Sequence, residues 1–241
     1  MKSSRLKIIA LDFDGTLVES NLIKDRAFET IFNDWPEHTE TMMRWHFAHN
    51  SIERREKFRY FVEEVLALTE RNDLIEKLST RFGELTRSAI IECPFVKGAK
   101  DFLEYIRNRS NVYLVSATPQ SDLEQIIEAK GLKDYFKKVY GAPIKKNEIL
   151  KKIMLTEKVS VNEILYIGDS PEDQQCAKDL GIRFIGRQSD RDLIDSTHLV
   201  FTDFSTIKTH MNKIMQLNQL KESLYNDDSS SLRFSDVTSS H

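Results

Sequence analysis

Short apolar runs separated by helical patterns constrain the fold of this chain most strongly. Runs without polar alternation are typical of strands buried on both faces of a parallel sheet. They lie at 7–11, 112–115, 138–140, 164–167 and 183–185, with a further candidate at 198–201. Helical patterns lie between most of them, at 99–109, 121–130, 146–155 and 171–180. This alternation predicts an α/β fold, a Rossmann-like parallel sheet with helices on both faces.

One long stretch, 18–93, interrupts the alternation of strands and helices. Its apolar residues, such as Phe58, Val62 and Val65, follow helical spacing, and no strand pattern is present. Pro94 is the kind of helix breaker expected where the chain returns to the sheet. The predicted domains are therefore a core domain at 1–17 and 94–204 and an inserted α-helical domain at 18–93.

After the last strand pattern, the spacing of Ile207, Met211, Ile214 and Met215 predicts an amphipathic helix over 205–225. We favour packing of this helix on its own core over binding of a partner. Serines and charged residues predominate in 226–241, which predicts a flexible tail.

Composition excludes several classes of partner. The 35 Lys and Arg against 38 Asp and Glu give a net charge of −3, so no basic excess favours binding to nucleic acid or a membrane surface. No apolar stretch approaches the ~20 residues needed to span a bilayer. The two cysteines fall in no metal-binding spacing and indicate a reducing compartment. We expect a cytoplasmic monomer or homodimer.

The strongest chemical motif is Asp12-Phe13-Asp14-Gly15-Thr16, directly after the first strand. Ligands in open α/β sheets bind outside the carboxyl ends of the strands. Carboxylates two residues apart on extended backbone point to the same side, and they repel unless a cation lies between them or one is protonated. A calcium loop is a poorer explanation, because Gly15 is the fourth residue and not the sixth.

A second acidic motif, Gly168-Asp169-Ser170-Pro171-Glu172-Asp173, follows the fourth strand. An N-cap Ser170 and a first-turn Pro171 explain part of it as a helix start. They do not explain Asp169, which precedes the cap. A hard cation such as Mg²⁺ prefers oxygen ligands, so Asp12, a backbone carbonyl and Asp169 are candidate ligands, with Asp173 in the outer shell.

Two weaker motifs fit the binding of phosphate. Ser116 follows the second strand, and its hydroxyl and the backbone N–H of Ala117 are candidate phosphate donors, although a simple turn explains the same residues. Lys145 and Lys146 open a predicted helix and are point charges suited to phosphate oxygens, although basic pairs are commonly solvated surface.

Together these four motifs resemble the haloacid dehalogenase-like hydrolase superfamily, in the branch with a helical cap after the first strand. The resemblance spans nearly all of 7–201. It implies that Asp12 is a nucleophile that forms an aspartyl-phosphate and that Asp14 is the general acid and base. It also implies Mg²⁺ bound by Asp12, the Asp14 carbonyl and Asp169.

The same resemblance assigns the remaining parts of the site. Asp173 assists the metal through water or Lys146, and Ser116 with Ala117 anchors the phosphate. The family-like run Lys-x-Glu-x-Leu begins at Lys146, which favours Lys146 over Lys145 as the lysine of the site. Close acids around Asp14 favour a raised pKa for its carboxyl group.

The function expected from this set is a Mg²⁺-dependent phosphatase that acts on a small phosphorylated metabolite, similar to the phosphoglycolate phosphatase group. One alternative is a sugar phosphomutase similar to β-phosphoglucomutase, which uses the same residues. A second is an inactive phosphate-binding or scaffold protein. The absence of a Gly-x-x-x-x-Gly-Lys segment excludes a P-loop kinase.

The helical insert is expected to cover the site and to select the leaving group. Within it, Arg54 or Arg55 resembles a substrate-contacting position of relatives, with exposed charges on a helix face as the alternative. We expect His46 and His49 to be surface residues.

Overall fold

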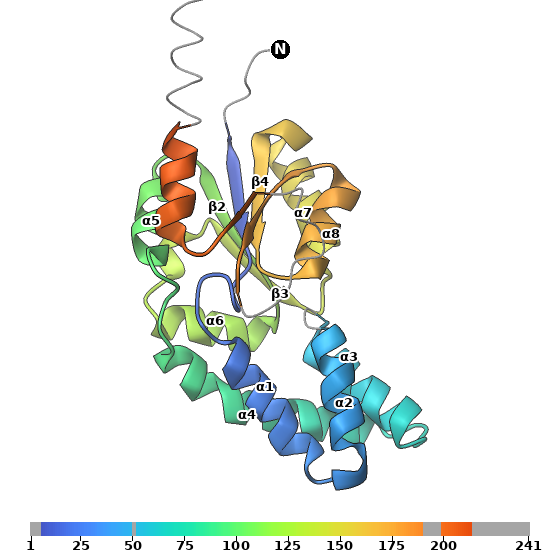
Figure 1. The fold of residues 1–241 in the computed structure, drawn as a ribbon. Helices are drawn as coiled ribbons and strands as arrows, with labels where there is room; N and C mark the ends of the chain where they lie inside the picture. The colour runs from blue at the N-terminus through green and yellow to red at the C-terminus, as the bar shows by residue number, and fades with distance from the viewer. Residues whose placement is uncertain (1–5, 50–51, 190–198, 214–241) are drawn as a thin grey trace, which may run out of the picture.

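A six-stranded parallel sheet forms one half of the molecule, and a group of helices forms the other (Figure 1). The computed structural model describes residues 6–49, 52–189 and 199–213. The strands are β1 Ile8–Leu11, β2 Asn111–Pro119, β3 Lys138–Ala142, β4 Ile164–Gly168, β5 Arg183–Arg187 and β6 Leu199–Phe201. Their order is β3-β2-β1-β4-β5-β6, and each neighbouring pair is parallel. The predicted Rossmann-like α/β fold is confirmed.

Burial on both faces explains the apolar runs of the strands. In β1, Ile9 and Leu11 join one core cluster, whereas Ile8 and Ala10 join the other. The first cluster includes side chains of α5 (Ala99–Arg107) and α6 (Gln120–Ala129). The second includes side chains of α7 (Lys146–Glu157) and α8 (Pro171–Leu180). Helices therefore cover both faces of the sheet (Figure 1).

The segment between β1 and α5 is helical and has a core of its own. Its helices are α1 Asn21–Phe32, α2 Pro36–Ala48, α3 Arg54–Tyr60, a π-helical turn Phe61–Val65 and α4 Asn72–Glu92. Short 3-10 turns elsewhere span Lys133–Tyr135 and Val161–Glu163. Aromatic side chains from α1, α3 and α4, including Phe28, Phe58 and Phe82, pack against one another. We propose that this insert is the separate domain expected at 18–93.

Two adjacent backbone crossings join the insert to the core. The N–H of Glu19 donates to the carbonyl of Pro94 at 3.0 Å, and the N–H of Val96 donates to the carbonyl of Leu17 at 3.0 Å. Val18 also forms an isolated antiparallel bridge with Phe95. The outgoing and returning chains thus lie side by side beneath the carboxyl edge of the sheet.

A further helix covers 204–213 and lies beside α5 (Figure 1). Its residues Phe204, Ile207 and Met211 are buried in the same cluster as Phe102 of α5. For the described residues, packing of this helix on its own core is confirmed. The rest of the expected helix, with Ile214 and Met215, and the expected tail at 226–241 lie outside the described residues.

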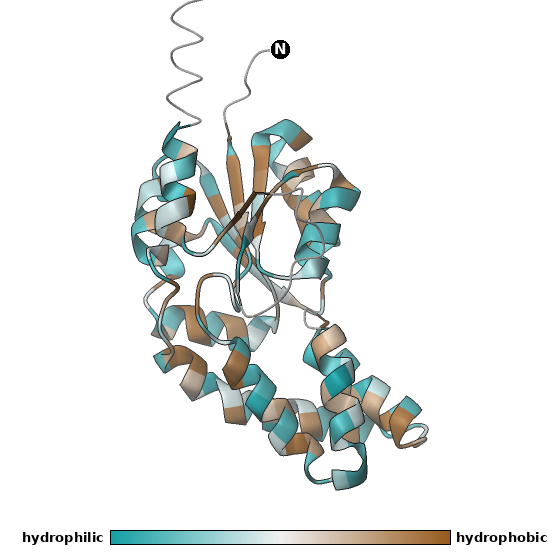
Figure 2. Cartoon of the chain, in the orientation of Figure 1, coloured by the Kyte–Doolittle hydropathy of each residue, from teal (hydrophilic) through white to brown (hydrophobic). Residues whose placement is uncertain are grey.

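Hydropathy follows this layering, because the strands are predominantly apolar and the helices carry polar residues on one side (Figure 2). Within the part of the chain that the structure describes, no helix is both long and apolar enough to cross a membrane.

Candidate active site

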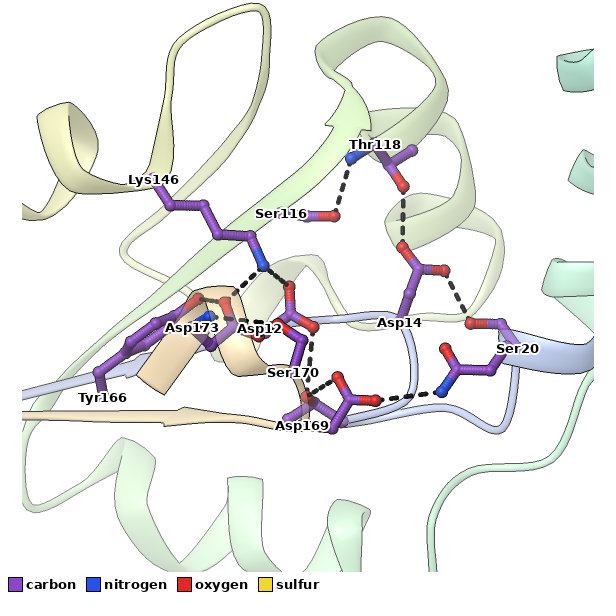
Figure 3. A network of polar contacts seen from close by, with 12 residues as sticks. Asp12, Asp14, Ser20, Ser116, Thr118, Lys146, Tyr166, Asp169, Ser170 and Asp173 are labelled. Carbon is purple, nitrogen blue, oxygen red and sulfur yellow. Dashed lines mark hydrogen bonds and ion pairs between the residues drawn. The ribbon is translucent and has the colours of Figure 1, made fainter. Parts of the chain in front are cut away.

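The acidic motif after β1 brings its two carboxylates to the carboxyl edge of the sheet, where they diverge (Figure 3). Asp12 lies beside Asp169, and Asp14 lies beside Ser20 and Thr118. Gly15 permits this turn, with φ of 71°. A Cβ atom at Gly15 would lie 2.1 Å from the Oδ2 atom of Asp169, so glycine also gives the loop room beside this carboxylate.

Three buried carboxylates, those of Asp12, Asp169 and Asp173, each place an oxygen within 4.8 Å of the others. Burial, reinforced by the neighbouring acids against the attraction of Lys146, raises the pKa of Asp12 to about 8. Burial followed by the charge of Asp173 raises the pKa of Asp169 to about 6. Thr16 Oγ1 lies 3.2 Å from Asp12 Oδ2 and 3.2 Å from Asp169 Oδ1. Such a set favours a bound cation or a shared proton, and its hard oxygen donors fit Mg²⁺.

Lys146 extends from the first turn of α7 into this cluster (Figure 3). Its Nζ atom donates to Asp12 Oδ1 at 2.8 Å and to Asp173 Oδ1 at 2.7 Å. Although burial opposes its charge, the two carboxylates raise the pKa of Lys146 above its usual value. Lys145 precedes the helix and is exposed, so the structure brings Lys146, and not Lys145, to the cluster.

Asp173 has hydrogen-bond donors on both carboxylate oxygens. Besides Lys146, Tyr166 Oη donates to Oδ1 at 2.5 Å, and Ser170 Oγ donates to Oδ2 at 2.7 Å. Ser170 is the N-cap of α8 with Pro171 at the first helical position, which confirms the expected helix start. These donors hold Asp173 behind Lys146 and leave the other two carboxylates nearer to the opening of the site.

The environment of Asp14 differs from the expectation. Its carboxylate accepts hydrogen bonds from Ser20 Oγ at 2.7 Å and Thr118 Oγ1 at 2.8 Å, and Lys24 Nζ lies 2.5 Å away. Burial opposes ionisation, but the charge of Lys24 and these hydrogen bonds lower the pKa of Asp14 below its usual value. The expectation of a raised pKa is wrong for this structure, because Asp14 faces Lys24 and not the other acids.

Ser116 and Ala117 line a pocket between the carboxyl edge of the sheet and the insert. Ser116 is buried, and its Oγ atom accepts a hydrogen bond from the backbone N–H of Thr118 at 3.1 Å, which is the geometry of a simple turn. Asp12, Asp14 and Lys146 line the same pocket. The pocket is partly open to solvent and is lined both by these residues and by residues of the insert.

Comparison with known families gives the relationship that this geometry suggests. The sequence model of the haloacid dehalogenase-like hydrolases matches residues 9–187. The chain belongs to the haloacid dehalogenase-like hydrolase family. The matched region contains all four motifs and the complete insert. None of the curated proteins matches the sequence.

Solved structures of similar fold come from several bacteria. A predicted phosphoglycolate phosphatase from Haemophilus somnus is 17% identical with a TM-score of 0.70, and the alignment covers 86% of this chain and 98% of that one. A predicted phosphatase from Clostridium acetobutylicum is 15% identical with a TM-score of 0.67, covering 88% and 100%. CbbY from Rhodobacter sphaeroides, in complex with phosphate, is 16% identical with a TM-score of 0.65, covering 83% and 95%. At these identities the likeness shows a shared fold.

In this haloacid dehalogenase-like hydrolase, the two candidate arginines of the insert have different surroundings. Arg54 lines the pocket, donates to Ser79 Oγ at 3.0 Å and lies 2.6 Å from Asp122 of α6. Arg55 pairs with exposed Glu76 and does not line the pocket. The structure therefore brings Arg54 to the candidate site and leaves Arg55 on the outer surface of the insert.

Two site residues of the insert were missed in the sequence. Lys24 pairs with Asp14 and donates to Thr118 Oγ1 at 3.1 Å, and Asn21 Nδ2 donates to Asp169 Oδ2 at 3.1 Å. Both lie in the first two turns of α1, shortly after the acidic motif. The sequence signal for these two residues was their closeness to the acidic motif. So few residues separate them from Asp12 and Asp14 that the chain cannot carry them far from these carboxylates.

The expectation that His46 is a surface residue is wrong. Its ring is buried at 2% exposure, and it lies between Asp25 of α1 and Lys57 of α3. His49 is partly buried and stacks on Trp45, with ring centroids 4.2 Å apart. The apolar spacing of α2 does not predict this burial, because His46 is a polar residue. Its buried ring is stabilised by polar partners on two other helices, which the sequence of α2 does not show.

Proposed function

We propose that this protein is a Mg²⁺-dependent phosphatase that hydrolyses a small-molecule phosphomonoester through an aspartyl-phosphate on Asp12. The observation that carries the proposal is the contact of Lys146 with both Asp12 and Asp173, inside a buried carboxylate cluster that opens into a pocket. A carboxylate attacks a phosphate dianion only when positive charge offsets the repulsion between them. Lys146 is the cation that the chain itself supplies.

Asp12, Asp169 and the backbone carbonyl of Asp14 are the proposed Mg²⁺ ligands. Asp173 acts from behind them, since its oxygens already accept from Lys146, Tyr166 and Ser170. When bound, the ion neutralises negative charge on the carboxylates and on the phosphate. Thr16 and Asn21 orient the ligand carboxylates through their hydrogen bonds.

In the first step, an oxygen of Asp12 forms a bond to phosphorus as the bond to the leaving oxygen breaks. The leaving oxygen takes its proton from Asp14. In the second step, Asp14 accepts a proton from water, which attacks phosphorus and releases phosphate from Asp12. Ser116, Ala117 and Lys146 bind the phosphate oxygens in both steps.

This role requires a proton on Asp14, whereas the contact with Lys24 favours the ionised form. The Lys24 side chain comes from the insert, so movement of the insert changes the charge beside Asp14. We propose that substrate binding weakens this ion pair and that Asp14 is protonated in the productive complex.

The relatives support a phosphorylated substrate. One similar structure is described as a predicted phosphoglycolate phosphatase, and CbbY was solved in complex with phosphate and with xylulose-(1,5)bisphosphate. We propose the same general class, a small phosphorylated metabolite, for this protein.

The test is phosphate release from a panel of phosphorylated metabolites by the wild type and by Asp12→Asn. We expect release that chelation of Mg²⁺ abolishes, that added Mg²⁺ restores, and that Asp12→Asn lowers by at least ~1000-fold. Acid-stable labelling of the wild-type protein by a ³²P-labelled substrate, with no labelling of Asp12→Asn, would identify the aspartyl-phosphate intermediate. Isomerisation of a sugar phosphate that depends on a bisphosphate activator, without net release, would instead establish the phosphomutase alternative. If no compound is hydrolysed and none is isomerised, the result would favour a phosphate-binding or scaffold role.

A further inference from the structure

One buried arginine of the core contacts the loop of the acidic motif at two points. Arg187 is the last residue of β5, and its side chain is 9% exposed. Its Nη1 atom donates to the backbone carbonyl of Gly15 at 2.9 Å, and its Nη2 atom donates to Glu19 Oε1 at 2.5 Å. Arg187 does not line the pocket, so any effect that it has on the site passes through these two partners. The phosphoryl chemistry proposed for the site uses neither contact.

The guanidinium group of Arg187 suits this double contact. Arginine presents its N–H donors in a rigid planar fork and keeps its charge when buried. Here one branch of the fork binds a main-chain oxygen and the other binds a carboxylate. A lysine carries its charge on one flexible ammonium group and does not offer two donors in a fixed plane. The contact therefore depends on the shape of the side chain as well as on its charge.

The main-chain contact of Arg187 lies next to a proposed Mg²⁺ ligand. The peptide bond between Asp14 and Gly15 is trans and planar, so the Asp14 carbonyl and the Gly15 N–H point in opposite directions. The Gly15 N–H donates to the carbonyl of Val18 at 2.9 Å, which directs the Asp14 carbonyl away from Val18. Arg187 holds the next peptide group through the Gly15 carbonyl. The peptide groups on both sides of Gly15 are thus held, and with them the direction of the Asp14 carbonyl.

Gly15 itself does not hold the loop in this conformation. A residue without a Cβ atom adopts positive and negative φ about equally readily, so the residue type alone does not select its φ of 71°. A side chain at this position would meet the carboxylate of Asp169, so the loop cannot gain rigidity from another residue type. Contacts from outside the loop have to select the conformation, and Arg187 supplies one of them.

The second contact of Arg187 reaches the first crossing between the core and the insert. In that crossing, the N–H of Glu19 donates to the carbonyl of Pro94 at 3.0 Å. The side chain of Glu19 is 42% exposed, so the surface provides the carboxylate that pairs with the buried guanidinium group. A buried cation is costly without such a partner. Glu19 therefore stabilises Arg187 in its place beside Gly15.

We infer that Arg187 is a positioning residue that holds the backbone carbonyl of Asp14 in place as a Mg²⁺ ligand, with Glu19 as its support. Arg187 contacts neither the substrate nor the reacting atoms. The inference deepens the proposed function and rests on it, because that function makes the Asp14 carbonyl a ligand. The affinity for Mg²⁺ and the rate of the chemical step should then depend on Arg187 more strongly than the binding of substrate does.

Calorimetric titration with Mg²⁺ alone tests this role without any substrate. We expect Arg187→Met to weaken Mg²⁺ binding by ~10- to 100-fold, the range found when a partner that orients a metal ligand is lost. Arg187→Lys keeps the charge without the planar fork and should still weaken binding by at least ~3-fold. Arg183→Met, which removes an exposed charge at the start of the same strand, should leave the affinity unchanged. Wild-type affinity in Arg187→Met or in Arg187→Lys would overturn the inference.

A double-mutant cycle tests the support that Glu19 gives. Glu19→Gln removes the counter-charge and keeps the arginine, so we expect a smaller loss of Mg²⁺ affinity, of about threefold. Because Glu19 acts through Arg187, Arg187→Met combined with Glu19→Gln should bind Mg²⁺ as well as Arg187→Met alone. Additive losses would contradict the supporting role of Glu19. Chemical denaturation checks that each variant is folded, and Arg187→Lys and Glu19→Gln carry the test if Arg187→Met does not fold.

Kinetics separates this inference from the proposed function. At a fixed, subsaturating Mg²⁺ concentration, we expect Arg187→Met to lower kcat for the best substrate of the panel by ~10- to 100-fold and to change KM by less than ~3-fold. If the wild type releases no phosphate but its Mg²⁺ affinity depends on Arg187, the phosphatase proposal fails and the positioning role stands. If the wild type is a Mg²⁺-dependent phosphatase and Arg187→Met changes neither Mg²⁺ affinity nor kcat, the positioning role alone fails.

Discussion

Two adjacent lysines provide a direct test of the site at the scale of single residues. Lys146 lies between Asp12 and Asp173, and its side chain is 13% exposed, whereas Lys145 faces solvent. Loss of the Lys146 charge leaves buried carboxylates uncompensated, so under the proposed function we expect it to affect both phosphate binding and the transition state.

We predict that Lys146→Met lowers kcat/KM for phosphate release by ~100- to 1000-fold, the range found when one electrostatic stabiliser of a transition state is removed. Lys145→Met should stay within ~2-fold of the wild type, because an exposed lysine contributes little. Steady-state kinetics of both variants checks this. Similar activities for the two variants would contradict the proposed role of Lys146.

Gly15 and Gly131 separate two consequences of replacing a glycine. Both have positive φ, 71° and 67°, but an added Cβ at Gly15 meets Asp169 Oδ2 at 2.1 Å, whereas one at Gly131 meets no atom within 4 Å. An alanine at either position therefore strains the backbone, but only an alanine at Gly15 displaces the carboxylate of Asp169.

We predict that Gly131→Ala and Gly15→Ala each lower the free energy of unfolding by at least ~1 kcal/mol through backbone strain. Only Gly15→Ala should also weaken Mg²⁺ binding, by ~10- to 100-fold, because it moves Asp169. Thermal unfolding and calorimetric titration with Mg²⁺ measure the two effects. Equal Mg²⁺ affinities in the two variants would argue against Asp169 as a ligand.

The sequence allowed prediction of individual residues where strand ends determine their position. Asp12, Asp169 and Lys146 meet because the carboxyl edge of a parallel sheet gathers the loops that follow its strands. The pKa of Asp14 and the burial of His46 depend instead on side chains from the insert. No spacing rule specifies how those helices pack, so neither property was predictable.

At the scale of elements, one lysine of the core caps a helix of the insert. Lys130, which follows α6, donates through Nζ to the carbonyls of Ile90, Ile91 and Cys93 at 3.1, 2.9 and 2.8 Å. These carbonyls lie at and just beyond the last turn of α4, where no intrahelical donors are available and the helix dipole is negative.

We predict that Lys130→Met lowers the free energy of unfolding by ~1–2 kcal/mol, because three terminal carbonyls lose a charged donor. Lys133→Met is the matched control, since Lys133 is exposed and its Nζ atom lies 4.0 Å from Glu128. Chemical denaturation of both variants gives the comparison. A control that is destabilised as much as Lys130→Met would contradict the capping role.

The bounds of a strand were predicted well where all of its residues are buried, and poorly where the strand runs from the core into the pocket. Strand β1 begins at Ile8, one residue later than expected, and ends at Leu11 as expected, because every residue of Ile8–Leu11 is buried and apolar. Strand β2 continues past Val115 to Pro119, because Ser116, Ala117 and Thr118 remain extended at the pocket. Their polar character signals a turn, and the pairing of β2 with β3 shifts its register between Val115 and Pro119.

At the scale of the whole molecule, Asp122 connects the insert to the core. It lies on α6 and pairs with Arg54 of α3 at 2.6 Å and with Arg87 of α4 at 2.8 Å. Its carboxylate is 9% exposed, and water screens its pair with Arg54, 14% exposed, less than its pair with Arg87, 38% exposed. The three residues hold two helices of the insert against the rim of the active-site pocket.

We predict that Asp122→Asn favours an open arrangement, because Arg54 and Arg87 lose their shared counter-charge. The expected signs are a larger radius of gyration by X-ray scattering and a KM raised by about tenfold, equivalent to ~1.4 kcal/mol. Glu124→Gln, on the exposed side of the same helix, should change neither. An unchanged radius of gyration in Asp122→Asn would show that other contacts hold the insert closed.

The central position of β1 has a consequence for the newly made chain. Its partners, β2 and β4, begin at Asn111 and Ile164, so the first strand leaves the ribosome long before either neighbour exists. The insert, whose aromatic core lies within 21–92, is complete much earlier. We therefore expect synthesis to deliver the helical insert while the apolar first strand still lacks both of its neighbours, so that this strand stays unpaired until the middle of the sheet can form.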